Sequence, residues 1–292
     1  MADRATVPLA AAPTAEASMR PAEVLARATR YLDAHDVDEP RRTAEILMEH
    51  VLHTDRAGLY SRAEGLDTAE ARAFGRALCR RCAGSPLQHL TGEQPFRSIT
   101  LRVRPGVFVP RPETEIVVDA ALEVIEGVAS PVVIDVGTGT GAIALSVKAE
   151  RPDARVLATD LSSEAVALAR ENADALGLDV RVLQGDGLEW LPSGVRASTV
   201  VSNPPYVTSE EYGALPREVR ADPEGALVGG TELHARLAAE APSRLAPGGW
   251  LVLEIGSTQG AEVAELLRGA FDGVEVLQDL AGRDRVVRGR LR

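Results

Sequence analysis

The sequence predicts a doubly wound α/β fold, in which a mostly parallel sheet is covered by helices on both faces. Three observations predict it: short apolar runs alternate with amphipathic stretches, a glycine-rich turn follows the first run, and polar residues follow later runs. The chain has 292 residues, 45% hydrophobic and 26% charged, which is enough for one large or two ordinary domains with a substantial core.

The alternation begins at Pro131 and continues to the end of the sequence. Strands are expected at 132–136, 155–159, 180–183, 199–201 and 249–255, with a terminal pair near 274–277 and 285–287. Helices are expected at 139–149 and 163–176, and Gly177 would cap the second. Parallel strands joined in this way deliver their loops to one edge of the sheet.

A small helical domain is expected at 19–84. Apolar residues recur at helical spacing over 21–34, 40–53 and 67–83, with Pro or Asp at each start. The domain is either a partner-recognition module or a packing appendage. It is preceded by a tail at 1–18 that we expect to be flexible, and followed by a linker at 85–115. Within the linker, residues 95–108 alternate in polarity around Pro105-Gly106, as a β-hairpin would, and the α/β domain occupies 116–292.

Composition removes several chemistries. Lys148 is the only lysine and no Gly-x-x-x-x-Gly-Lys motif is present, which argues against P-loop phosphoryl transfer and lysine Schiff bases. Neither Cys79 with Cys82 nor His50 with His53 has the two further ligands that a metal site needs, so no metal is expected. No apolar run approaches the roughly 18 residues of a membrane span. A cytoplasmic protein that makes no membrane contact is therefore expected.

The chain is acidic, and the acidity is uneven. It contains 32 basic and 43 acidic residues. Residues 1–84 are nearly balanced, with 12 basic and 13 acidic residues, whereas residues 85–292 have 20 basic and 30 acidic ones. An enzyme that grips nucleic acid unaided is expected to have a basic surface, because neutralising phosphates supplies most non-specific affinity. Direct nucleic-acid binding is therefore not expected.

A nucleotide-like cofactor is predicted at the glycine-rich turn that follows the first strand. Glycines there permit a tight turn and close backbone approach to a ligand. Asp160 closes the second strand, where its carboxylate can accept hydrogen bonds from both ribose hydroxyls. The pattern fits a dinucleotide or S-adenosylmethionine, although it lacks the Gly-x-Gly-x-x-Gly spacing expected for NAD. The turn comprises Gly137, Thr138, Gly139, Thr140 and Gly141.

Two further polar positions are expected at the same sheet edge. Asp186, with Gly187 beside it, follows the third strand and could bind an adenine amino group, or could simply be a turn residue. Asn203-Pro204-Pro205-Tyr206 follows the fourth strand. Its two prolines stiffen the loop and remove two donors, so the loop presents carbonyl acceptors suited to an NH2 group. Asn-Pro and Pro-Pro also occur simply as loop punctuation.

These residues together resemble the release-factor glutamine methyltransferases, the PrmC/HemK family. The resemblance covers nearly the whole chain after the tail. It rests on the run from Val109 to Glu115, on Asp135 to Gly141, on Asp160, and on Val201 to Tyr206. Further matches are Ala226-Leu227, Gly229-Gly230, Leu253-Glu254-Ile255-Gly256, Gln259-Gly260 and Asp279 to Val287.

The resemblance implies a seven-stranded methyltransferase domain behind a helical N-terminal domain and a hairpin linker. It also implies methyl transfer from S-adenosylmethionine to the amide nitrogen (N5) of the glutamine in the Gly-Gly-Gln motif of class I peptide chain release factors. Arg111 and Glu113 would help to bind this substrate, although capping of the next helix also accounts for the Glu113 carboxylate. The chain departs from the family at Gly187, where a bulky residue is usual, so Leu188 or Trp190 becomes a candidate for packing adenine.

The expected chemistry is an in-line attack by a poorly nucleophilic amide nitrogen. The Asn203 side-chain oxygen and the Pro204 carbonyl would accept its two N–H groups, and Tyr206 would pack the glutamine stem. Three alternatives remain open: adenine-N6 methylation of DNA or RNA, a non-catalytic S-adenosylmethionine-binding adaptor, and a dehydrogenase. The acidic charge, the intact Asn203 loop and the glycine spacing, respectively, argue against them.

Overall fold

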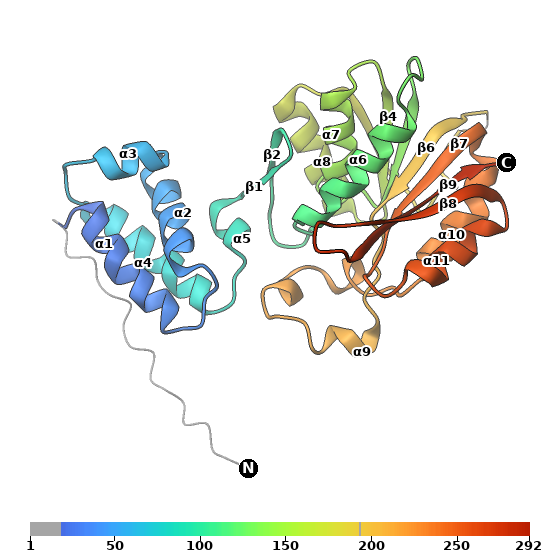
Figure 1. The fold of residues 1–292 in the computed structure, drawn as a ribbon. Helices are drawn as coiled ribbons and strands as arrows, with labels where there is room; N and C mark the ends of the chain where they lie inside the picture. The colour runs from blue at the N-terminus through green and yellow to red at the C-terminus, as the bar shows by residue number, and fades with distance from the viewer. Residues whose placement is uncertain (1–18, 193) are drawn as a thin grey trace, which may run out of the picture. The chain divides into compact units, whose positions relative to one another are not determined.

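A computed structural model describes residues 19–192 and 194–292, and these form two compact units (Figure 1). The first unit ends at Gly92 and the second comprises Glu93–Arg292. The tail predicted at 1–18 lies outside the described residues. No helix within the described ranges is long and apolar enough to cross a membrane.

The first unit is helical, as predicted. Its three longer helices are α1 (Pro21–Asp33), α2 (Pro40–Leu52) and α4 (Thr68–Cys82), within a residue or so of the expected bounds. Asp67 and Glu70 form a capping box at the start of α4, with Oδ1 of Asp67 2.8 Å from the Glu70 amide. The sequence missed α3 (Arg56–Ser61) and α5 (Leu87–Thr91), which are too short to show a helical repeat.

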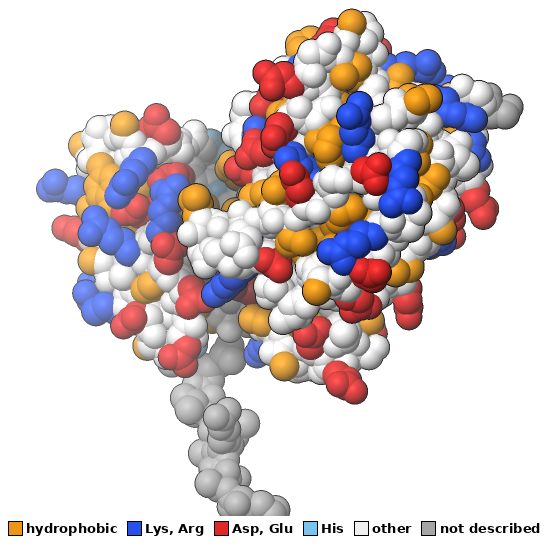
Figure 2. Space-filling model, turned by 45° about the vertical axis from the view of Figure 1, so that its right-hand side comes forward, with side chains coloured by type: hydrophobic (Ala, Val, Ile, Leu, Met, Phe, Trp, Pro, Cys, Tyr) orange, Lys and Arg blue, Asp and Glu red, His pale blue; other side chains and the backbone are white. Residues whose placement is uncertain are grey.

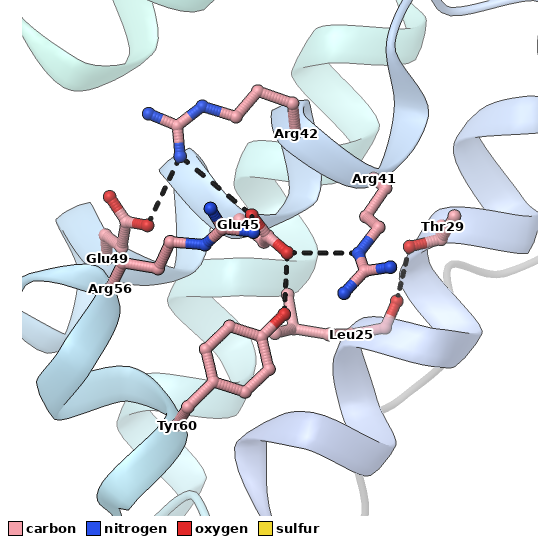
Figure 3. Close-up of polar contacts among 8 residues, drawn as sticks. All are labelled: Leu25, Thr29, Arg41, Arg42, Glu45, Glu49, Arg56 and Tyr60. Carbon is pink, nitrogen blue, oxygen red and sulfur yellow. Dashed lines mark hydrogen bonds and ion pairs between the residues drawn. The ribbon is translucent and has the colours of Figure 1, made fainter.

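A buried carboxylate ties α2 to α3 within this unit (Figure 3). Glu45 accepts hydrogen bonds from Tyr60 Oη at 2.6 Å and Arg41 Nε at 3.1 Å, and Arg56 Nη2 lies 3.3 Å away. The pKa of Glu45 is lowered because these hydrogen bonds and charges outweigh the opposing effect of its burial. The hydroxyl and the arginines thus compensate a charge in the helical core.

The hairpin exists, but the predicted position of its turn was wrong. Strands β1 (Glu93–Phe96) and β2 (Ile99–Arg102) are antiparallel and are joined at Arg97, which has a φ of 50°. Arg97 tolerates this left-handed geometry because its amide donates to Glu115 at 3.0 Å and its guanidinium donates to Glu150 at 2.6 Å. Pro105-Gly106 forms a separate turn outside the hairpin. The tertiary contacts of Arg97 therefore outweigh the local turn propensity of Pro105-Gly106 in fixing the position of the hairpin turn.

The second unit is built on a seven-stranded sheet with the strand order β5-β4-β3-β6-β7-β9-β8, confirming the predicted fold class. The first five strands of that order are parallel, and β9 pairs antiparallel with both β7 and β8. The strand bounds are β3 Val132–Val136, β4 Arg155–Asp160, β5 Val180–Gln184, β6 Ala197–Ser202, β7 Leu245–Glu254, β8 Phe271–Gln278 and β9 Asp284–Leu291.

Helices cover both faces of the sheet (Figure 1). Neighbouring strand residues point to opposite faces, so Val133 belongs to one core cluster and Ile134 to the other. One cluster includes α6 (Glu115–Val124), α7 (Ala142–Glu150) and α8 (Ser163–Leu176), and the other includes α10 (Glu232–Glu240) and α11 (Gly260–Arg268). Between β6 and α10 lie only α9 (Ser209–Tyr212), η2 (Val219–Ala221) and η3 (Glu224–Ala226). The remaining short turns are η1 (Pro112–Thr114) and η4 (Ala241–Ser243).

One carboxyl lies in the centre of the sheet. Asp135 on β3 is fully buried; its Oδ2 accepts from Thr138 Oγ1 at 2.6 Å and from the Ala144 amide at 3.2 Å, while Oδ1 has no partner among the described residues. Burial raises the pKa of Asp135 to about 7, despite these two hydrogen bonds. The folded state therefore retains a proton that the unfolded chain releases near pH 4.

This raised pKa predicts a pH-dependent stability. Asp135 contributes most below pH 4, and its contribution is lost as pH rises through about 7. Asp135→Asn stays neutral, so its stability relative to the wild type should increase by roughly 1–3 kcal/mol between pH 5 and pH 8. Urea unfolding at the two pH values measures the difference. A difference that does not change with pH would show that Asp135 is already ionised at pH 5.

Candidate functional site

A cavity of about 570 Å³ lies in the second unit, beyond the carboxyl ends of β3 to β6. The chain winds outward from β3 through β4 to β5 and then returns to the other side of β3 at β6. This reversal is where open α/β sheets bind ligands, because the loops on its two sides diverge. The volume suits a small molecule of cofactor size.

The glycine-rich turn lines one wall of the cavity. The amides of Gly137 and Thr138 both donate to the Thr159 carbonyl at 2.9 Å, which fixes the turn to β4. Gly137 and Gly139 have φ values of 73° and 57°, and the Cβ position of Gly139 meets no atom within 4 Å. Thr140 also lines the cavity, whereas Gly141 does not: its Cβ would lie 2.8 Å from Leu145, so glycine there allows close packing of α7.

Asp160 lies beside this turn at the end of β4. Its Oδ2 accepts from the Gly139 amide at 2.8 Å and its Oδ1 from the Ser162 amide at 2.9 Å. Each carboxylate oxygen keeps a further lone pair for a ligand hydroxyl. Burial raises the pKa of Asp160, and the backbone hydrogen bonds oppose this shift.

Asp186 lines the cavity, and its side chain forms an ion pair. Its carboxylate accepts two hydrogen bonds from Arg236 of α10, one of them at 3.0 Å, and the hydrogen bonding lowers its pKa. Gly187 also lines the cavity, and a Cβ there would lie 2.8 Å from Arg236 Nη2 and 2.9 Å from Glu240 Oε2. Arg236 thus occupies the space beside Gly187 that a larger side chain would need.

Leu188 and Trp190, the candidates for packing adenine, do not lie where the sequence analysis expected. Neither lines the cavity: Leu188 is buried in the core cluster that includes α10, and Trp190 packs against that cluster while donating to the Gly187 carbonyl at 2.9 Å. The apolar cavity residue next to Asp160 is Leu161, whose side chain is 69% exposed. Amphipathic spacing could not distinguish side chains that face the core from those that face the cavity.

The Asn203-Pro204-Pro205-Tyr206 loop forms the opposite wall of the cavity. All four residues line it, so β6 brings them opposite the glycine-rich turn. The Asn203 side-chain nitrogen donates to Thr114 Oγ1 at 3.1 Å, which leaves the side-chain oxygen as an acceptor. None of the described residues donates a hydrogen bond to the Pro204 carbonyl.

Two segments hold this loop from outside. Gln259 Nε2 donates to the Tyr206 carbonyl at 2.9 Å, and its own Oε1 accepts from the Gly256 amide at 2.9 Å. A Cβ at Gly229 would lie 2.6 Å from the Pro205 carbonyl oxygen, so only glycine fits this close approach. The loop is therefore rigid on both sides.

A buried glutamate lies beneath the loop at the end of β7. Glu254 is 1% exposed, and burial raises its pKa to about 7, against hydrogen bonding from Thr114, the charge of Arg285 and hydrogen bonding from Tyr206. Burial and the neighbouring Glu254 charge raise the pKa of Tyr206. Tyr206 therefore stays a neutral hydroxyl near pH 7.

Of the two substrate residues predicted between Val109 and Glu115, only Arg111 lines the cavity. It pairs with the buried carboxylate of Asp222, which also accepts from the Val109 amide at 3.3 Å. The Glu113 side chain is 43% exposed and lies 3.8 Å from Arg285. Arg111 thus joins the Pro112 turn to the segment after the Asn203 loop.

Sequence reasoning assigned no role at the site to four residues of this region: Thr114, which it considered only as a possible start of the next helix, Asp222, Arg236 and Glu254. Thr114 and Glu254 lay inside quoted motifs, and a glutamate that follows three apolar strand residues is itself a signal of a buried polar contact. Asp222 and Arg236 gave no such signal, because their partners are 111 and 50 positions away in the chain.

The arrangement suits a nucleoside ligand facing a second, amide- or amine-bearing group. Gly139 leaves open space at the turn, Asp160 offers acceptors for hydroxyls, and Leu161 offers apolar contact. Asn203 and Pro204 present oxygens from the opposite wall. These donors and acceptors fit S-adenosylmethionine without requiring a metal, and no cluster of three His, Cys, Asp or Glu side chains that could hold one occurs among the described residues.

Comparison with known proteins confirms the resemblance. Residues 23–92 match the PrmC N-terminal domain, and residues 98–221 match the methyltransferase small domain. The release factor glutamine methyltransferase of Moorella thermoacetica is 45% identical over 271 residues, covering 90% of this chain and 95% of that protein. The release factor glutamine methyltransferase of Deinococcus radiodurans is 44% identical over 273 residues, covering 92% and 97%.

A solved structure supports the fold independently. The 16S rRNA N2 G1207 methyltransferase of T. thermophilus, in complex with AdoMet and guanosine, superposes with a TM-score of 0.53. It is 23% identical and covers 68% of this chain and 50% of that one, so the likeness concerns the fold alone. By its much closer similarity to the relatives from Moorella and Deinococcus, the chain belongs to the family of release factor glutamine methyltransferases.

Proposed function

We propose that this enzyme transfers a methyl group from S-adenosylmethionine to the side-chain amide nitrogen of the glutamine in the Gly-Gly-Gln motif of class I peptide chain release factors. One observation supports placing this reaction in the cavity. The Asn203 loop, with its hydrogen-bond acceptors, lines the same cavity as the glycine-rich turn and Asp160. Family membership supplies the reaction and its acceptor.

S-adenosylmethionine supplies an electrophilic methyl group on a sulfonium. Residues 137–140 of the turn would place their backbone against the cofactor, and Asp160 would accept hydrogen bonds from the ribose hydroxyls. Asp186, Gly187 and Leu161 border the space for adenine, with Arg236 filling the side of Gly187. The Asn203 backbone lies beside the turn: its carbonyl oxygen is 4.0 Å from the place that a Cβ would occupy at Gly137. Asn203 is therefore close enough to the turn to contact the cofactor as well as the substrate.

The glutamine amide is oriented by the opposite wall. The Asn203 side-chain oxygen and the Pro204 carbonyl accept its two N–H groups, which aims the nitrogen at the methyl group. As the nitrogen–carbon bond forms and the sulfur–carbon bond breaks, positive charge appears on nitrogen, and both acceptors stabilise it until one proton leaves. Pro205 and Tyr206 enclose the substrate side chain, and Arg111 lines the same cavity. Glu113 lies outside this lining and is a further substrate contact that the family resemblance implies.

Adenine-N6 methylation of nucleic acid is not favoured. The family relatives act, by name, on release factors. On the face of the second unit shown in Figure 2, arginines lie interspersed with acidic side chains rather than forming a continuous basic stripe.

The proposal also includes the partner and the location of the enzyme. The partner is a release factor, and the enzyme contacts neither nucleic acid nor a membrane directly and acts in the cytoplasm. Recognition of the release factor by the helical N-terminal domain belongs to the proposal too.

Asn203→Ala should abolish methylation. The substitution removes the oxygen that orients the glutamine amide, so turnover should fall at least a hundredfold while S-adenosylmethionine affinity changes only a few-fold. Transfer of labelled methyl groups to purified release factor measures turnover, and calorimetry measures binding. Release factor with its Gly-Gly-Gln glutamine replaced, and separately nucleic acid, serve as acceptor controls. Label on nucleic acid alone, or full turnover in the variant, contradicts the assignment.

Asp160→Ala should instead weaken cofactor binding. Losing charge-assisted hydrogen bonds to the ribose is expected to cost about 1–3 kcal/mol, which raises the dissociation constant about 5-fold to 150-fold. Asp174→Ala, on an exposed position of α8, is the matched control and should bind normally. Unchanged affinity of Asp160→Ala in calorimetry would remove Asp160 from the site.

A further inference from the structure

The proposed reaction depends on which end of the Asn203 amide faces the cavity. An asparagine side chain has nearly the same shape in either orientation, so packing alone does not select one. Only the oxygen can accept a hydrogen bond from the glutamine NH2, because an NH2 group turned to the same place would repel it. Some neighbouring group must therefore fix the amide.

Thr114 is the side chain that contacts this amide. It lies at the end of η1, 89 positions before Asn203, and its Oγ1 is 3.1 Å from Asn203 Nδ2. The residue is only 3% exposed, although it is among those that line the cavity. A hydroxyl can donate as well as accept, which means that Thr114 alone would tolerate either orientation.

In the structure this hydrogen bond has one direction: Asn203 Nδ2 donates and Thr114 Oγ1 accepts. Glu254 is a buried carboxyl whose charged form is favoured by Thr114 and Tyr206, although burial raises its pKa to about 7. Above that pH the carboxylate can only accept, so it favours a Thr114 hydroxyl that turns its hydrogen toward Glu254 and its oxygen toward Asn203. The nitrogen of Asn203 then points to Thr114 and its oxygen points into the cavity.

We propose that Thr114 is a positioning residue for methyl transfer: with Glu254 behind it, Thr114 holds the Asn203 amide with its oxygen toward the substrate nitrogen. The inference rests on the proposed function, since it explains how the acceptor of that reaction is aimed. Neither Thr114 nor Glu254 exchanges atoms with the substrate in this scheme. Their role is the direction of one hydrogen bond.

Thr114→Val tests the proposal, because valine keeps the shape of threonine and removes the hydroxyl. At pH 8, where Glu254 is ionised, kcat for release-factor methylation should fall at least tenfold. KM and dissociation constant for S-adenosylmethionine should stay within about threefold, since the cofactor wall is untouched. Thr114→Ser restores the hydroxyl and should recover kcat to within about threefold of the wild type. Thr114→Ala serves if the valine variant does not fold.

A matched control separates positioning from stability. Thr199 on β6 is also fully buried, and its Oγ1 donates to the Trp250 carbonyl at 3.1 Å, but it does not contact the Asn203 side chain. Thr199→Val should lose thermal stability comparable to Thr114→Val and keep wild-type kcat. If Thr114→Val keeps wild-type kcat, or if Thr199→Val loses as much kcat as Thr114→Val, the positioning role is wrong.

Glu254→Gln provides the second arm. The side-chain NH2 of a glutamine can donate to the Thr114 oxygen, which leaves the Thr114 hydrogen free to donate to Asn203. This favours the amide orientation in which the Asn203 nitrogen, rather than its oxygen, faces the substrate. The kcat of Glu254→Gln should fall, and the loss in the double variant with Thr114→Val should be smaller than the sum of the two single losses, because both substitutions disturb the Thr114 hydrogen bond. Additive losses overturn the proposal. An active Asn203→Ala enzyme would instead overturn the proposed function itself, so the two failures are distinguishable.

Discussion

The pairing of β3 with β6 is the constraint on which the rest of the site depends. Val136 and Ser202 are partners at the carboxyl ends of these strands, and Ser202 Oγ donates to the Val136 carbonyl at 2.7 Å in a buried position. The next residue of each strand begins a wall of the cavity: Gly137 on one side and Asn203 on the other. The distance between these two walls is therefore set by backbone hydrogen bonds in the sheet, which are among the least deformable parts of a protein.

The loop that follows β6 is rigid because distant segments support it from several directions. Gln259 holds the Tyr206 carbonyl, Gly229 allows the backbone of residues 227–230 to lie against Pro205, and Thr114 holds Asn203. Each support comes from a segment that carries the family resemblance. The family motifs thus supply both residues that line the cavity and residues that hold this lining in place.

The sequence was sufficient for the fold and for the walls of the site. Apolar strands such as Val132–Val136 are read directly from composition, and their order along the chain places their loops at one edge. It was insufficient where the outcome depends on contacts between distant segments. The hairpin turns at Arg97 rather than at Pro105-Gly106 because Glu115 and Glu150 hold Arg97, and Arg236 occupies the space beside Gly187. No local pattern encodes such pairs, since each partner is an ordinary surface residue by itself.

The Arg111–Asp222 ion pair has a consequence for the long connection between β6 and α10. That connection contains only short helical turns, yet Leu215, Val219 and Pro223 from it line the cavity. Asp222 fastens its middle to Arg111 and to the Val109 amide, while a bridge between Val207 and Val228 closes its base. A free segment of this length would lose conformational entropy each time substrate ordered it. Because the connection is held at Asp222 and at the Val207–Val228 bridge, its conformational entropy is lost once, when the chain folds. The connection is then already ordered when a release factor binds.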